Sequence, residues 1–117
     1  MIKITLVVFL LASTVLCYAE SEQSISIKAG FLTGNSFREL NYAGKCGYAM
    51  GFLDGVFMSP MFDAPKKELE WIERCVTGMN ERQVVAILEK FLSENPARWH
   101  ESMNVLAWVA MKEACKR

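Results

Sequence analysis

The feature that most constrains the fold is a helical repeat of apolar residues between Asn80 and Pro96. Apolar side chains recur there at intervals of three and four residues: Val84, Ile87, Leu88, Phe91 and Leu92. This spacing places them on one face of an α-helix and leaves polar residues on the other face. Asn80 and Gln83 have the spacing of a capping box at the helix start, and Asn95-Pro96 marks the helix end. The segment therefore predicts a one-faced amphipathic helix.

The end of the chain, from about Glu101 to Cys115, predicts a helix that is apolar on two sides. One stripe contains Met103, Leu106, Ala107, Ala110, Met111 and Ala114. A second stripe, on a different side, contains Val105, Trp108 and Val109. Such a helix is either central to a bundle or packed against a second molecule. We therefore regard the second stripe as a candidate face for a homodimer or another partner.

Residues 45–59 are apolar and carry glycine at every fourth position. Gly47, Gly51 and Gly55 would share one face of a helix, at a cost of about 1 kcal/mol of helix propensity each. Close approach by another backbone would explain this cost, since glycine has no Cβ atom. A similar motif dimerises membrane helices, but the charged Asp54 disfavours a membrane span. We expect a tightly packed core helix in which Asp54 lies beside the core and needs a partner.

Two shorter segments complete the predicted architecture. Ser36 and Glu39 have capping-box spacing for a short helix that ends near Gly44, and residues 68–74 allow one more helical turn. Together the segments predict an all-α fold, a small four- to five-helix bundle in residues 30–117. This length suits one domain, because two independent cores would not fit.

Pro60 and Pro65 bracket a segment that we expect to form neither a helix nor a strand, because proline interrupts both. Apolar side chains in and beside this segment either fold down over the bundle as a lid or form a loop that binds a partner. The candidate partner-binding residues are Met61, Phe62 and Trp71, with Asp63, Lys66 and Lys67 at the rim.

Residues 1–19 have the pattern of a secretory signal peptide. Lys3 precedes the apolar run Ile4 to Leu16, and Cys17-Tyr18-Ala19 places small residues before a cleavage site. The run is shorter than the ~20 apolar residues of a membrane anchor, and acidic residues follow at once. Cleavage after Ala19 predicts export to an oxidising compartment without a membrane anchor, and residues 20–29 are expected to form a flexible arm.

Export changes the expected role of the cysteines. After cleavage the chain keeps Cys46, Cys75 and Cys115, which are disulfide candidates before they are metal ligands or catalysts. One pair can form, and the remaining thiol is then buried, free or available to a second chain. A disulfide would stabilise a domain whose hydrophobic core is small.

Charge and motif content disfavour several classes of function. The 13 Lys plus Arg balance 13 Asp plus Glu, whereas nucleic-acid binding needs a cationic excess. The single histidine, His100, cannot build a multi-histidine metal site. Cys75 and His100 could form a nucleophile and base, but a disulfide would silence the thiolate. We therefore predict a binding protein without catalytic residues, metal or cofactor, in which His100 makes a local hydrogen bond or pairs with a carboxylate such as Asp54.

In order and spacing, these features resemble the Rap/Tai family of immunity proteins. The pattern comprises Thr33-Gly34-Asn35, Leu40, Cys46-Gly47-Tyr48, Gly51, Asp54, Gly55, Cys75, Gln83, Phe91-Leu92, Asn95-Pro96, His100 and Cys115. The resemblance covers residues 30–115. It implies that the glycines, Tyr48, Asp54, Pro96 and His100 are structural motif residues.

The resemblance implies a small, helical, disulfide-bonded periplasmic protein that is often a homodimer. Characterised members bind peptidoglycan amidase effectors of type VI secretion and occlude their active sites, which protects sibling cells. Many members have a further cysteine where this chain has Asn41, so the resemblance favours a Cys46–Cys75 disulfide and leaves Cys115 without a mate. The alternative function is a small periplasmic chaperone or stress protein that binds exposed apolar surfaces.

Overall fold

The computed structural model describes residues 29–116, which contain five α-helices joined by turns and short 3₁₀ helices. The α-helices are α2 (Gly34–Glu39), α3 (Tyr42–Met58), α4 (Glu70–Val76), α5 (Glu81–Glu94) and α6 (Met103–Cys115). The 3₁₀ helices are η1 (Ser59–Phe62), η2 (Lys66–Leu69) and η3 (Pro96–Arg98). The prediction of an all-α bundle with a disulfide is confirmed. The predicted signal peptide and residues 20–28 of the predicted arm lie outside the described residues.

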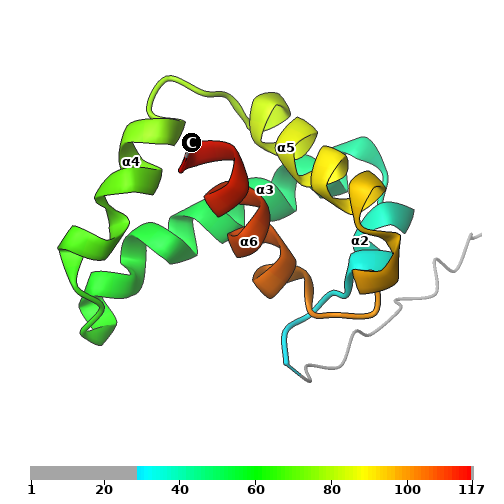
Figure 1. The fold of residues 1–117 in the computed structure, drawn as a ribbon, viewed down its shortest axis with the longest axis horizontal. Helices are drawn as coiled ribbons and strands as arrows, with labels where there is room; N and C mark the ends of the chain where they lie inside the picture. Colours follow the sequence, from blue (N-terminus) through cyan, green and yellow to red (C-terminus); the bar gives the residue numbers. More distant parts are fainter. Residues whose placement is uncertain (1–28, 117) are drawn as a thin grey trace, which may run out of the picture.

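The core forms where α6 packs against α5, with α4 and α2 on either side of α6 (Figure 1). Phe37 of α2 and Ile72 of α4 join a set of buried residues from α5 and α6: Val84, Val85, Leu88, Phe91, Leu92, Met103, Leu106, Ala107, Ala110 and Met111. The amphipathic repeat of α5 therefore packs as predicted. Its capping box is also confirmed, since the Asn80 N–H donates to Gln83 Oε1 (2.9 Å) and the Gln83 N–H donates to Asn80 Oδ1 (3.1 Å).

The boundary between α2 and α3 differs from the predicted one. The Thr33 side chain caps α2 by accepting a hydrogen bond from the Ser36 N–H (3.2 Å), so Ser36 lies inside the helix. The Asn41 side chain accepts from the Gly44 N–H (2.8 Å) and begins α3. A short polar side chain that captures a free backbone N–H starts a new helix at that point. The chain therefore breaks at Asn41 and not near Gly44.

The glycine-containing helix α3 lies at the edge of the bundle, and Ala49 is its one buried residue. Gly47, Gly51 and Gly55 are exposed, and a Cβ atom added at any of them would meet no other atom within 4 Å. The prediction of a tightly packed core helix is therefore wrong. Because α3 is apolar around most of its circumference, its sequence has no periodicity that marks the inner face.

The disulfide joins Cys75 in α4 to Cys115 in α6, with 5.6 Å between the two Cα atoms. Cys46, near the start of α3, is a half-buried free thiol. The predicted Cys46–Cys75 disulfide is therefore wrong. The physical reason is the packing, since α3 lies against α5 whereas α4 lies against α6 (Figure 1). Cys75 consequently meets the last turn of α6.

Candidate functional site

The predicted partner-binding loop begins at η1, which continues directly from α3. Pro60 lies in the first turn of η1, and the Asp63 N–H closes the turn by donating to the Pro60 carbonyl (3.3 Å). Asp63 has a φ of 67°, and this left-handed conformation redirects the chain. Met61 and Phe62 are 79% and 73% exposed at this turn. They project from the bundle, so the interpretation as a lid is wrong.

Met61 and Phe62 continue an exposed apolar surface of α3. The large side chains on this surface are Met50, Phe57 and Met58, which are 52%, 40% and 48% exposed. Within α3 the spacing i, i+7 and i+8 places Met50, Phe57 and Met58 on one side of the helix, and Met61 follows Met58 after one turn of the 3₁₀ helix η1. We call Met50, Phe57, Met58, Met61 and Phe62 the α3–η1 apolar face. Large exposed apolar side chains gathered on one part of a folded domain are typical of interaction surfaces, which makes this face the candidate partner surface.

The other predicted loop residues are divided between the surface and the interior. Asp63, Lys66 and Lys67 are exposed and follow the α3–η1 apolar face along the chain. Trp71 of α4 instead packs edge-on against Trp108 of α6, with 5.2 Å between the ring centroids. Trp71 therefore belongs to the contact between α4 and α6, and its assignment to the exposed loop is corrected.

The second apolar stripe of α6 is mostly covered within the chain. Trp108 and Val109 are half-buried against the core, whereas Val105 is 49% exposed. The helix is apolar on two sides because α5 and α4 both pack against it. Of the two interpretations given by the sequence, the central position in the bundle is the one that the structure supports. Val105 is left as the exposed member of the predicted partner face.

The remaining motif residues do not converge on one site. Tyr48 packs edge-on against Phe37, with 5.5 Å between ring centroids, and burial raises the pKa of Tyr48 to about 12. Asp54 and His100 are both exposed, and neither takes part in an ion pair within residues 29–116. The expected position of Asp54 beside the core is therefore wrong. Pro96 begins η3 at the end of α5.

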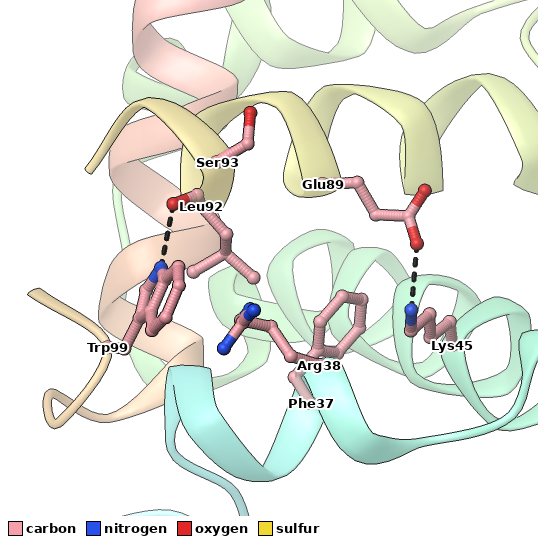
Figure 2. Close-up of a pocket in the computed structure, with 7 residues that line it drawn as sticks. All are labelled: Phe37, Arg38, Lys45, Glu89, Leu92, Ser93 and Trp99. Carbon is pink, nitrogen blue, oxygen red and sulfur yellow. Dashed lines mark hydrogen bonds and ion pairs between the residues drawn. The ribbon is translucent and has the colours of Figure 1, made fainter. Parts of the chain in front are cut away.

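A cleft of about 410 Å³ lies between α2, the start of α3 and α5, and the sequence analysis did not predict it. Its lining residues are Phe37, Arg38, Lys45, Glu89, Leu92, Ser93 and Trp99 (Figure 2). Arg38 stacks on Trp99, with its guanidinium carbon Cζ 3.3 Å from the ring centroid. Lys45 Nζ lies 2.8 Å from Glu89 Oε1. No local sequence motif indicates this cleft, because its residues come from segments that are distant in the sequence. The segment at Thr33 meets the segment at Trp99 and Ser102 only in the folded chain.

Between residues 29 and 116, no group of three or more His, Cys, Asp or Glu side chains is arranged to hold a metal ion. No helix in the described range has both the length and the apolar character needed to cross a membrane. Comparisons of the chain with known protein families, curated proteins and solved structures found no match.

Proposed function

We propose that this protein is an immunity protein that binds a peptidoglycan amidase effector of type VI secretion and occludes its active site. The observation that carries the proposal is the exposure of Met61 and Phe62 at the tip of the α3–η1 apolar face. The resemblance to the Rap/Tai family supplies the class of partner. The inhibition is steric and stoichiometric, without turnover and without a cofactor.

The conformation of the tip favours tight association. Two backbone hydrogen bonds of 3.3 Å hold the turn, one from the Asp63 N–H to the Pro60 carbonyl and one from the Ala64 N–H to the Ser59 carbonyl. A turn that is ordered before binding loses less conformational entropy when it docks. Methionine and phenylalanine at the centre, with charged residues at the rim, also match the usual anatomy of a protein interface.

The disulfide supports the proposed location of the protein. Disulfides form and persist in oxidising compartments, among them the bacterial periplasm. The bond between Cys75 and Cys115 fixes α4 to α6, and α4 follows the loop that carries Met61 and Phe62. We therefore place the protein in the periplasm, where a cell-wall amidase would act.

The test replaces Met61 and Phe62 together by serine and measures binding to a peptidoglycan amidase effector from the same organism, sought first among the products of adjacent genes, by titration calorimetry. Central interface side chains commonly contribute about 2–4 kcal/mol, so we expect affinity to fall about 30-fold or more. Thermal unfolding should be unchanged, because both side chains are exposed. Val105→Ser is the matched control, since it removes an exposed apolar side chain from α6.

The possible results test the proposed contact surface and the proposed immunity function separately. If the double variant binds the amidase as well as the wild type does, the α3–η1 apolar face is not the contact surface. If Val105→Ser weakens binding and the double variant does not, the contact lies on α6. If the wild-type protein neither binds nor inhibits any amidase effector of its organism, the proposed function is wrong.

The exposed methionines also favour a second candidate, a chaperone that binds apolar surfaces of many proteins, because methionine adapts to varied partners. Stoichiometry distinguishes the two functions. An immunity protein binds one effector in a fixed ratio and leaves unrelated proteins unaffected. A chaperone suppresses the aggregation of unrelated unfolded proteins, which light scattering of a chemically denatured client would detect.

A further inference from the structure

The part of the chain from η1 to the end of α4, residues 59–76, has few contacts with the rest of the molecule, and we call it the η1–α4 segment. Its hydrogen bonds within the described residues join only positions that are close in sequence, such as Asp63 with Pro60 and Glu68 with Pro65. None of its charged side chains forms an ion pair within residues 29–116. In the described part of the chain, therefore, neither a hydrogen bond nor an ion pair ties this segment to another helix.

The packing of the segment on the bundle comes mainly from the contact of α4 with α6. Ile72 is the one buried side chain of η1, η2 and α4. Beside it, Trp71 packs edge-on against Trp108 of α6, and Lys116 Nζ lies 5.0 Å from the centroid of the Trp71 ring. The other buried apolar residues of the core belong to α2, α3, α5 and α6. The core is therefore nearly complete without α4.

The disulfide is the covalent link between the segment and the bundle. Cys75 lies in the last turn of α4, and Cys115 is the last residue of α6. In Figure 1, α4 lies at the periphery of the molecule, and the end of α6 lies beside it. Both cysteines are half-buried and lie outside the buried core, which leaves the bond open to attack by a thiol in solution.

Without the disulfide, the docked position of α4 has little support. A helix of seven residues is too short to be stable by itself in water. The burial of one isoleucine and the partial burial of its neighbours is small against the conformational entropy lost by ordering the whole segment. The disulfide changes this balance, because it restricts the freedom of the detached segment. We therefore expect the docking of α4 to depend on the cross-link.

We propose that the Cys75–Cys115 disulfide is a redox switch that controls the docking of α4 on α6. In the oxidised protein α4 stays docked, whereas in the reduced protein the η1–α4 segment detaches and α2, α3, α5 and α6 stay folded. A dithiol reductant operates the switch by thiol–disulfide exchange. The reductant gives up two electrons and two protons and becomes a disulfide, while the bond between Cys75 and Cys115 becomes two thiols. Local opening of this kind is typical of elements with few buried contacts.

The switch also controls the proposed contact surface, and this part of the inference rests on the proposed function. Met61 and Phe62 lie in η1, between α3 and α4 in the chain. With α4 docked, the chain around them is anchored at both ends. With α4 detached, it is anchored only at α3, so binding of a partner has to order more of the chain. Tight binding is therefore restricted to the oxidised protein, in the compartment where disulfides form.

The first experiment measures amide hydrogen exchange by nuclear magnetic resonance in the wild-type protein, with and without the dithiol dithiothreitol. On reduction, the hydrogen-bonded amides of α4 should exchange about 30-fold faster or more, whereas those in the middle of α5 should stay at least about 100-fold slower than in an unfolded chain. The circular dichroism signal of the paired Trp71 and Trp108 rings should disappear. Cys46→Ser is the matched control and should respond as the wild type does, since Cys46 lies outside the disulfide.

The second experiment measures amidase binding by a double variant, Cys75→Ser with Cys115→Ser, which leaves the amidase unexposed to a reductant. Calorimetry should show an affinity about tenfold or more below that of the wild type, because the segment has to be ordered on binding. Cys46→Ser should bind with wild-type affinity.

Each part of the proposal has a result that would overturn it. Equal protection of α4 in the oxidised and reduced protein would show that packing alone holds this helix. Simultaneous loss of protection in α4, α5 and α6 would show that the disulfide stabilises the whole domain and not one segment. Unchanged amidase affinity of the double variant would refute control of the contact surface. A wild-type protein that binds no amidase would refute the proposed function instead, and the exchange experiment would still decide whether the switch exists.

Discussion

Replacing the outward glycines of α3 by alanine should stabilise the protein. Gly51 lies in the interior of a 17-residue helix, and an added Cβ atom would meet nothing within 4 Å. Alanine is favoured over glycine in a helix interior by about 1 kcal/mol, and here no steric cost opposes that gain. For a domain of this size, about 1 kcal/mol corresponds to an increase in Tm of roughly 4–8 °C. The same argument applies to Gly47 and Gly55.

Gly34→Ala provides the opposing control. A Cβ atom there would lie 2.9 Å from Leu106 Cδ1 and 3.0 Å from both the Cα atom and the carbonyl oxygen of Trp99. Backbone atoms cannot move aside cheaply, so we expect a loss of about 1–3 kcal/mol, as in other overpacked sites. Sequence alone gives no reason to expect opposite effects from Gly34→Ala and Gly51→Ala.

The assay is urea and thermal unfolding followed by circular dichroism, with the disulfide intact, at two protein concentrations. A gain in stability for Gly51→Ala and a loss for Gly34→Ala, both independent of concentration, would support the reasoning. Destabilisation by Gly51→Ala would refute it, because something would then have to pack against the stripe. If that destabilisation grew with protein concentration, the packing partner would be a second copy of the chain.

Two further predictions concern the disulfide and the half-buried tyrosine Tyr48. Cys75→Ser or Cys115→Ser should each lower the free energy of unfolding by about 4 kcal/mol, because the cross-link spans 40 residues, whereas Cys46→Ser should change it by less than about 1 kcal/mol. An equal effect of all three variants in urea unfolding would contradict this assignment. Burial raises the pKa of Tyr48 from 10.0 to about 12, so above pH 10 the unfolded chain binds fewer protons than the native one. Stability should therefore be unaffected below pH 10 and fall between pH 10 and about 12. Urea unfolding against pH tests this, and the fall should be smaller in Tyr48→Phe.

The local features of the fold were predictable from short stretches of sequence. The α5 helix, its capping box and its termination at Asn95 depend on residues within a few positions of one another. The division of α5 into a buried and an exposed face follows from its period of apolar residues. The exposed turn at Met61 was located by its prolines, although the sequence left open whether the turn covered the bundle or projected from it.

The outward face of α3 and the disulfide pairing depend on packing between segments far apart in the sequence. An all-round apolar helix such as α3 can rotate about its axis without changing its pattern, so only its contacts with α5 decide which side is exposed. The positions of the cysteines in the sequence likewise do not show which of them lie close together in space. Cys75 pairs with Cys115 because α4 and α6 are neighbours in the fold. The Arg38–Trp99 stack has the same origin, because two segments distant in sequence meet only after the chain has folded. Periodicity and capping are therefore set by neighbouring residues, whereas the buried face of α3, the partner of Cys75 and the cleft beside α2 are set by tertiary packing.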